Sequence, residues 1–260
     1  NSLSGMSASR LAAIRMNERV VATVAVLSLT VGAIVFGELA FVLGDVAAAA
    51  ANIELTSLRT TLLSLVALQG VGFIGGGLAY LYWRGAPTVP IAFPSLNQWG
   101  LVLVGWVGML AANIVTGIAT QLANIPMPNS SVTDIALGNP TVIIVLFVAS
   151  FLIIGPGEDF FFRGVVQGRL REVFGPKAAI ALATVIFGLI HATNFVGSPP
   201  VSIAATVGRL IVVSTVLGGL YEYTDNLAVP VAIHSVYNAT LFGLLYVATI
   251  YGVEPAFVLV

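Results

Sequence analysis

Long apolar runs without charged residues follow one another along almost the whole chain, and they constrain its fold more than any other feature. A helix needs about 20 apolar residues to cross the hydrocarbon core of a bilayer, where every backbone polar group must pair within the protein. Charged residues make up only 8% of the 260 residues, whereas a soluble domain carries about 25%. We therefore predict an all-α fold, a polytopic transmembrane helical bundle.

Seven of the runs are long enough to span a membrane. They cover residues 20–43, 61–83, 99–123, 140–173, 177–195, 201–222 and 227–249. Residues 250–260 begin a further, short run, so we expect seven to eight helices. Since no internal repeat or linker divides the chain, we expect residues 1–260 to form a single integral membrane domain.

Lysine and arginine gather on one side of the predicted spans. The basic residues before the first span and after the second and fourth are Arg10, Arg15, Arg19, Arg84, Arg169, Arg171 and Lys177. Loops rich in Lys and Arg face the cytoplasm. We therefore expect a multi-pass protein of the cell membrane with a cytoplasmic N-terminus.

Composition also excludes several functions. The chain has no cysteine, so a thiol nucleophile and a cysteine-bound metal are ruled out. The net charge is −1 and no basic cluster is present, so nucleic acid is not an expected partner. Gly72 and Gly76 form a GxxxG pair, which is typical of a close contact between transmembrane helices.

Two carboxylates and an arginine lie inside the fourth predicted span, although each charge in hydrocarbon costs a few kcal/mol. Asp159 and Arg163 are four residues apart and can pair along one helix. We expect a buried, structural ion pair. Glu158 is rotated about 100° from Asp159, so it is free to face another part of the bundle.

The two histidines of the chain also lie in apolar runs. His234 and Asn238 are four residues apart and share a helix face. The Gly175–Pro176 dipeptide predicts a turn between antiparallel spans. Glu158 lies 17 residues before this glycine and His191 lies 16 after it, which puts both about 25 Å from the turn. We expect them to meet inside the bundle, in a site open to the cytoplasmic side.

These residue types together can hydrolyse an amide bond. A carboxylate beside a neutral imidazole can hold and deprotonate a water molecule, and a second histidine with an amide can donate hydrogen bonds to an oxyanion. Buried Glu and His residues also serve proton relays. A proton-coupled transporter or binding protein is therefore the alternative, although the chain lacks the inverted repeat common in transporters.

The order and spacing of these residues resemble the CPBP family of intramembrane proteases, also called the ABI family, which contains the type II CAAX prenyl proteases. The family motifs are Glu-Glu-x-x-x-Arg, Phe-x-x-x-His and His-x-x-x-Asn or Asp. The matching positions here are Glu158, Asp159, Arg163, Phe187, His191, His234 and Asn238. The resemblance covers about residues 140–245, and the first three spans carry no motif.

The resemblance implies an intramembrane endopeptidase that cuts near the cytoplasmic membrane surface. Glu158 and His191 would activate water, His234 and Asn238 would form the oxyanion site, and Asp159 and Arg163 would support them. Asp159 departs from the second glutamate of the family motif but keeps its charge, so its structural role is expected to survive.

The resemblance also bears on the cofactor and on the substrate. The family is often labelled a metalloprotease, and a zinc ion bound by Glu158, His191 and His234 is the alternative to the metal-free mechanism that we expect. The expected partners are the lipid bilayer and a membrane-associated peptide or protein substrate, prenylated or not.

Overall fold

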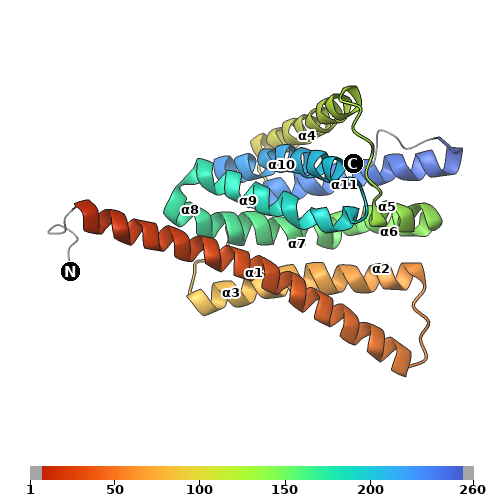
Figure 1. The fold of residues 1–260 in the computed structure, drawn as a ribbon, viewed down its shortest axis with the longest axis horizontal. Helices are drawn as coiled ribbons and strands as arrows, with labels where there is room; N and C mark the ends of the chain where they lie inside the picture. The colour runs from red at the N-terminus through yellow and green to blue at the C-terminus, as the bar shows by residue number, and fades with distance from the viewer. Residues whose placement is uncertain (1–7, 254–260) are drawn as a thin grey trace.

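The computed structural model describes residues 8–253 and shows a helical bundle without a β-strand in that range (Figure 1). Seven helical segments are long and apolar enough to cross a membrane, as the sequence predicts. They are Met16–Ala50, Ser57–Arg84, Leu96–Leu122, Pro140–Phe174, Pro176–Phe195, Pro200–Thr224 and Ala228–Tyr251. The further run predicted at residues 250–260 falls mostly on positions 254–260, which lie outside the described residues.

Several of these segments are composed of consecutive helices. The single helices are α1 (Ala8–Ala50), α4 (Leu96–Leu122), α10 (Pro200–Thr224) and α11 (Ala228–Tyr251). The second segment contains α2 (Ser57–Leu65), the π-helix η2 (Val66–Gly75) and α3 (Gly76–Arg84). The fourth contains α6 (Pro140–Ala149), the π-helix η3 (Ser150–Ile154), α7 (Gly155–Asp159), the π-helix η4 (Phe160–Gln167) and α8 (Gly168–Phe174). The fifth contains α9 (Pro176–Ile190) and the 3₁₀-helix η5 (His191–Phe195), and the short α5 (Ser131–Gly138) lies between α4 and α6.

The turn between the fourth and fifth segments forms where the sequence predicts it. Gly175 has φ 78°, a conformation that only glycine adopts without strain. Pro176 is the first residue of α9, where its missing N–H costs no helical hydrogen bond. The α8–α9 turn therefore makes the two segments antiparallel and sets which residues lie level with each other.

Helix α1 crosses the second segment diagonally and also packs against α8 (Figure 1). A Cβ on Gly72 would lie 2.5 Å from the carbonyl oxygen of Ala33, and one on Gly76 would lie 3.5 Å from the Cβ of Ala33. The close helix contact predicted from the GxxxG pair is thus confirmed, with α1 as the partner. This contact holds the second segment against the rest of the bundle.

Aromatic side chains fill the centre of the bundle. The ring of Phe73 stacks on Phe161 at 5.0 Å and meets Phe162 edge-on at 5.4 Å. The Phe162 ring also lies 5.2 Å from that of Phe187. All four residues belong to one buried cluster. This cluster joins η2, η4 and α9, and η4 carries Arg163 while α9 leads directly into His191.

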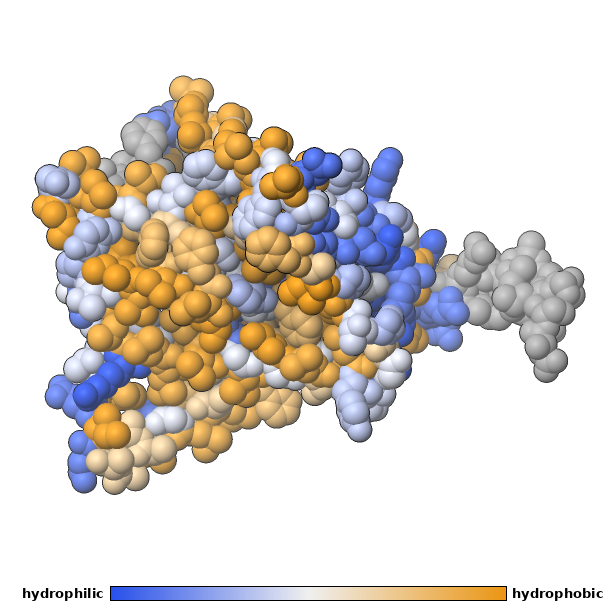
Figure 2. Space-filling view, turned by 180° about the vertical axis from the view of Figure 1, so that it is seen from behind, coloured by the Kyte–Doolittle hydropathy of each residue, from blue (hydrophilic) through white to orange (hydrophobic). Residues whose placement is uncertain are grey.

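Charged residues mark one end of the bundle. Arg19 at the start of α1 donates to the carbonyl of Val173 at 3.3 Å, and Arg84 at the end of α3 pairs with Glu172 at 3.1 Å. We call this the arginine-rich end; its described basic residues are Arg19, Arg84, Arg169, Arg171 and Lys177. Figure 2 shows hydrophilic residues gathered at the end from which α1 starts, beside a broad hydrophobic surface over the middle of the bundle.

Candidate active site

The backbone before Glu158 departs from regular α-helix. The N–H of Gly155 donates to the carbonyl of Ser150, five residues earlier, as in the π-bulges that often mark functional sites. A Cβ on Gly155 would come within contact distance of the Ser235 hydroxyl, and one on Gly157 would lie 2.9 Å from Oε1 of Gln69. The two glycines therefore let α11 and η2 approach the chain immediately before Glu158.

Glu158 is buried, with 7% of its surface exposed. Its Oε1 accepts a hydrogen bond from Nε2 of Gln69 at 2.8 Å. Its Oε2 lies 3.8 Å from Nε2 of His234. One oxygen of the carboxylate is thus held by an amide from the second segment, while the other faces an imidazole from the seventh.

Asp159 connects the fourth segment to the seventh. Its Oδ1 lies 2.9 Å from Nη1 of Arg163, so the predicted i,i+4 ion pair is confirmed. Its Oδ2 lies 3.0 Å from Nδ1 of His234. Since a carboxylate accepts, Nδ1 of His234 carries the proton in this pair. Asp159 therefore holds the ring of His234 in a defined orientation, a role that the sequence does not predict.

Arg163 is enclosed by polar and aromatic groups. Its side chain is 2% exposed, and Nη2 donates to Oγ of Ser214 at 2.7 Å. The guanidinium lies 4.7 Å from the ring centre of Phe187, close enough for a cation–π interaction. These contacts offset the cost of burying the charge. They also fix the position of Arg163, which in turn holds Oδ1 of Asp159.

His191 stands at the end of α9, where the helix tightens into η5. Its Nδ1 lies 2.7 Å from the carbonyl oxygen of Phe187. Because a carbonyl only accepts, Nδ1 is the protonated nitrogen, which leaves Nε2 with a lone pair in the neutral ring. Phe187 packs between the site residues, since its ring contacts Arg163, His191 and His234.

The four residues predicted as catalytic line one cavity of about 470 Å³. Glu158, His191, His234 and Asn238 all contribute to its wall. Asn238 lies one helical turn after His234 on α11 and is half-buried. Most of the remaining wall is apolar, with residues such as Ile34, Leu65, Leu68, Phe73 and Leu146. The four polar side chains therefore line a cavity whose other walls are mainly hydrophobic.

The cavity reaches the end of the bundle opposite the arginines, and the side of the membrane that this end faces stays a prediction. Val132, Thr193 and Asn194 belong to its wall, and they lie on α5 and η5, at the end of the bundle opposite the arginines (Figure 1). The reason is depth. A position about 25 Å from the α8–α9 turn is most of the way across a hydrocarbon core about 30 Å thick.

A zinc ion, the alternative to metal-free chemistry, needs three protein ligands and an open position. Glu158, His191 and His234 share a cavity, but no three His, Asp or Glu side chains in the described part of the chain are placed to hold one metal ion. The metal-free mechanism stays a prediction, and the chemistry below uses the side chains alone.

Gln69 is the site residue that the sequence reasoning missed. It lies on η2, in a segment without a family motif, and it is buried with 5% exposure. The available signal was a lone amide in the apolar run 61–83, because polar residues in transmembrane helices usually face other helices. That signal alone does not indicate which residue Gln69 contacts.

Comparison with protein families identifies the segment that carries this geometry. Residues 140–240 match the family described as type II CAAX prenyl endopeptidase, Rce1-like. This segment belongs to the Rce1-like family. It contains Glu158, Asp159, Arg163, His191, His234 and Asn238, and it covers less than half of the chain. Comparisons with curated proteins and with solved structures find no match.

Proposed function

We propose that the protein is an intramembrane endopeptidase that hydrolyses a peptide bond with a water molecule activated by side chains. The observation that carries the proposal is the cavity itself. A buried carboxylate, two imidazoles and an amide line one apolar chamber within a membrane bundle. Membership of residues 140–240 in the Rce1-like family, which implies CAAX-type protease activity, supports the same reaction class.

Glu158 is the proposed general base, and His191 lines the same cavity. Gln69 holds one oxygen of Glu158 and leaves the other to accept a proton from water. The free Nε2 of His191 accepts a second hydrogen bond from the same water. The water oxygen then attacks the substrate carbonyl, and its proton passes to Glu158 and from there to the leaving amine. General acid–base catalysis of this kind contributes roughly 10²–10⁴-fold to the rate.

His234 and Asn238 are the proposed oxyanion donors. The hydrogen bond to Asp159 fixes Nδ1 of His234 and leaves Nε2 directed toward Glu158. As an imidazolium, His234 donates from Nε2 to the developing oxyanion. The side-chain amide of Asn238 donates from one helical turn away. Donors of this kind stabilise the tetrahedral intermediate by about 2.7–4 kcal/mol each.

The proposed substrate is a membrane-associated peptide or protein with an apolar anchor. Leu65, Leu68 and Phe73 give the cavity an apolar wall next to Gln69. Such a wall can take a lipid chain or an apolar side chain near the scissile bond, because burying apolar surface is favourable by about 25 cal/mol per Å².

The deciding experiment measures cleavage of a fluorogenic farnesylated CAAX peptide by the purified protein in detergent. We expect activity in the wild type, and a loss of about 10²–10⁴-fold in kcat for Glu158→Gln and for His191→Ala. Glu172→Gln is the matched control, since it makes the same substitution at a half-exposed position of the same segment.

Each other outcome has a clear meaning. Wild-type activity in Glu158→Gln would show that Glu158 is not the general base. Loss of activity in a chelator, restored by zinc, would overturn the metal-free mechanism. Solute transport abolished by the same variants, without any cleavage of peptides, would establish the transporter alternative instead.

A further inference from the structure

The distribution of basic residues gives the bundle an orientation in the membrane. Seven of the ten Lys and Arg residues lie before the first span or next to the connections at the arginine-rich end. At the opposite end, only Arg59 lies beside a connection. All the connections between spans are short, which is the condition under which the positive-inside rule holds. The arginine-rich end therefore faces the cytoplasm, and α5 and η5 face the other side.

The site residues lie nearer the end that faces away from the cytoplasm. His191 is the first residue of η5, the last turn of its segment. Glu38 on α1 and Ser64 on α2 also belong to the cavity wall, and each lies in the half of its segment that leads to the α1–α2 connection at that end. A second cavity of about 230 Å³ between α1 and α2 is also lined by Glu38 and Ser64. Both cavities thus extend toward the end of the bundle opposite the arginine-rich end.

A buried layer separates the site from the arginine-rich end. Phe161, Phe162 and Arg163 follow the site carboxylates along η4, and none is more than 2% exposed. One turn further, Gln167 is 1% exposed and donates to the carbonyl of Gly218 at 3.1 Å. This layer fills the bundle directly on the cytoplasmic side of Glu158.

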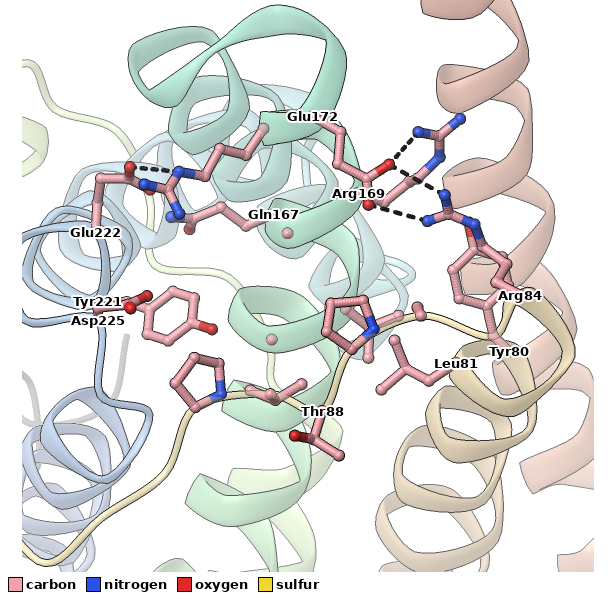
Figure 3. A pocket seen from close by; sticks show the side chains of 18 residues that line it. Tyr80, Leu81, Arg84, Thr88, Gln167, Arg169, Glu172, Tyr221, Glu222 and Asp225 are labelled. Carbon is pink, nitrogen blue, oxygen red and sulfur yellow. Dashed lines mark hydrogen bonds and ion pairs between the residues drawn. The ribbon is translucent and has the colours of Figure 1, made fainter.

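The cytoplasmic side of this layer has a pocket of its own. The pocket has a volume of about 490 Å³. Figure 3 shows that it is bordered by ion pairs of Glu172 with Arg84 and Arg169, and of Arg171 with Glu222. No residue lines both this pocket and the catalytic cavity. This pocket at the cytoplasmic end therefore does not lead to the proposed catalytic groups.

We propose that the catalytic cavity receives its substrate from the extracytoplasmic half of the membrane. This inference rests on the proposed peptidase function and specifies its substrate class. The scissile bond would lie near the extracytoplasmic end of a membrane-anchored peptide. A prenylated cysteine near a cytoplasmic C-terminus would be presented on the wrong side.

Cysteine labelling tests the sidedness directly, because the natural chain contains no cysteine. Thr193→Cys places a single thiol at an exposed position of the catalytic cavity wall, and Thr88→Cys places one at an exposed position of the cytoplasmic pocket. Intact cells are treated with a membrane-impermeant maleimide, and labelling is compared with that after permeabilisation. We expect full labelling of Thr193→Cys in intact cells, and labelling of Thr88→Cys only after permeabilisation.

Every other labelling pattern contradicts the proposal. Reversed labelling would mean that the bundle has the opposite orientation. If neither variant is labelled in intact cells, the cavity is closed to the outside. If both are labelled, the arginine-rich end is not cytoplasmic. Labelling in detergent after denaturation confirms that each thiol is present in equal amount.

A second measurement gives the side of cleavage. A farnesylated fluorogenic peptide with a glutamate tail, which prevents it from crossing the bilayer, is added to spheroplasts or to inverted membrane vesicles. We expect cleavage in spheroplasts and none in inverted vesicles; the reverse would overturn the proposal. If the peptide is not cut even in detergent, the proposed peptidase function fails for this substrate, while the labelling result still decides the sidedness.

Discussion

Asp159 accepts a hydrogen bond from Nδ1 of His234 across 3.0 Å, although the two residues are 75 positions apart. The same carboxylate pairs with Arg163 through its other oxygen. The ion pair that looks structural in the sequence therefore also orients a residue of the proposed oxyanion site. This double role links the stability of the bundle to its chemistry.

Replacing Asp159 should affect both the stability of the bundle and the proposed reaction. In Asp159→Asn, the charge facing Arg163 and His234 is lost, and removing one partner of a buried ion pair costs about 3–5 kcal/mol. Thermal unfolding in detergent should therefore occur at a lower temperature, and kcat should fall because His234 loses the carboxylate that fixes its tautomer.

Asp159→Glu is the conservative variant for this prediction. It keeps the charge and restores the family motif, so it should recover most of the activity and the thermal stability. Equal activity of Asp159→Asn and the wild type, at a temperature where both are folded, would show that Asp159 does not position His234.

Gln69 offers a test outside the family segment. Gln69→Leu removes the hydrogen bond to Glu158, and a hydrogen bond to a charged group is worth about 1.5–3 kcal/mol. We expect kcat/KM to fall by roughly 10–100-fold, since each 1.4 kcal/mol corresponds to a factor of ten. The effect should appear mainly in kcat, because Gln69 holds the base.

The control for this prediction is Gln121→Leu. It makes the same substitution at an exposed position of α4, outside the cavity that Glu158 lines, and should change kcat/KM little. A Gln69→Leu protein with wild-type kcat would remove Gln69 from the proposed site.

The fold was predictable because bilayer thickness sets the length of each span, and because turn residues such as Gly175 and Pro176 mark its ends. The Asp159–Arg163 pair was predictable for the same kind of reason, since i,i+4 neighbours meet within one helix. Local spacing also predicted that Glu158 and His191 lie at the same distance from the α8–α9 turn, and both residues line the same cavity.

The cross-segment contacts could not be predicted in this way. Gln69 and Glu158 are 89 positions apart, and their meeting depends on how two segments pack rather than on any spacing. The pairing of His234 with Asp159 likewise depends on the close approach of α11, which Gly155 permits beside Ser235. One-dimensional periodicity contains no information on these rotations and contacts.

The GxxxG contact predicts a large difference between two glycine-to-alanine substitutions. In Gly72→Ala, the new Cβ would lie 2.5 Å from the carbonyl oxygen of Ala33, so α1 must move away. In Gly32→Ala, the new Cβ meets no atom within 4 Å, and alanine favours helix over glycine by about 1 kcal/mol. Thermal unfolding in detergent should occur at a lower temperature for Gly72→Ala and at an equal or higher one for Gly32→Ala.

The reverse order would mean that α1 does not pack on the second segment as described. The measurement is independent of catalysis, so it tests the fold whether or not the protein is a peptidase.

The ion pairs at the arginine-rich end give the last prediction. Arg84 pairs with Glu172 at 3.1 Å, but the side chain of Glu172 is 45% exposed, and ion pairs in contact with water contribute about 0–1 kcal/mol. We expect Arg84→Gln to leave the cleavage rate in detergent unchanged and to shift thermal unfolding only slightly. Arg163→Gln, at 2% exposure, should lower both strongly, because it leaves the buried Asp159 carboxylate without its cation. A large loss of activity in Arg84→Gln would mean that the pocket at the arginine-rich end takes part in catalysis and that the buried layer does not isolate it from the site.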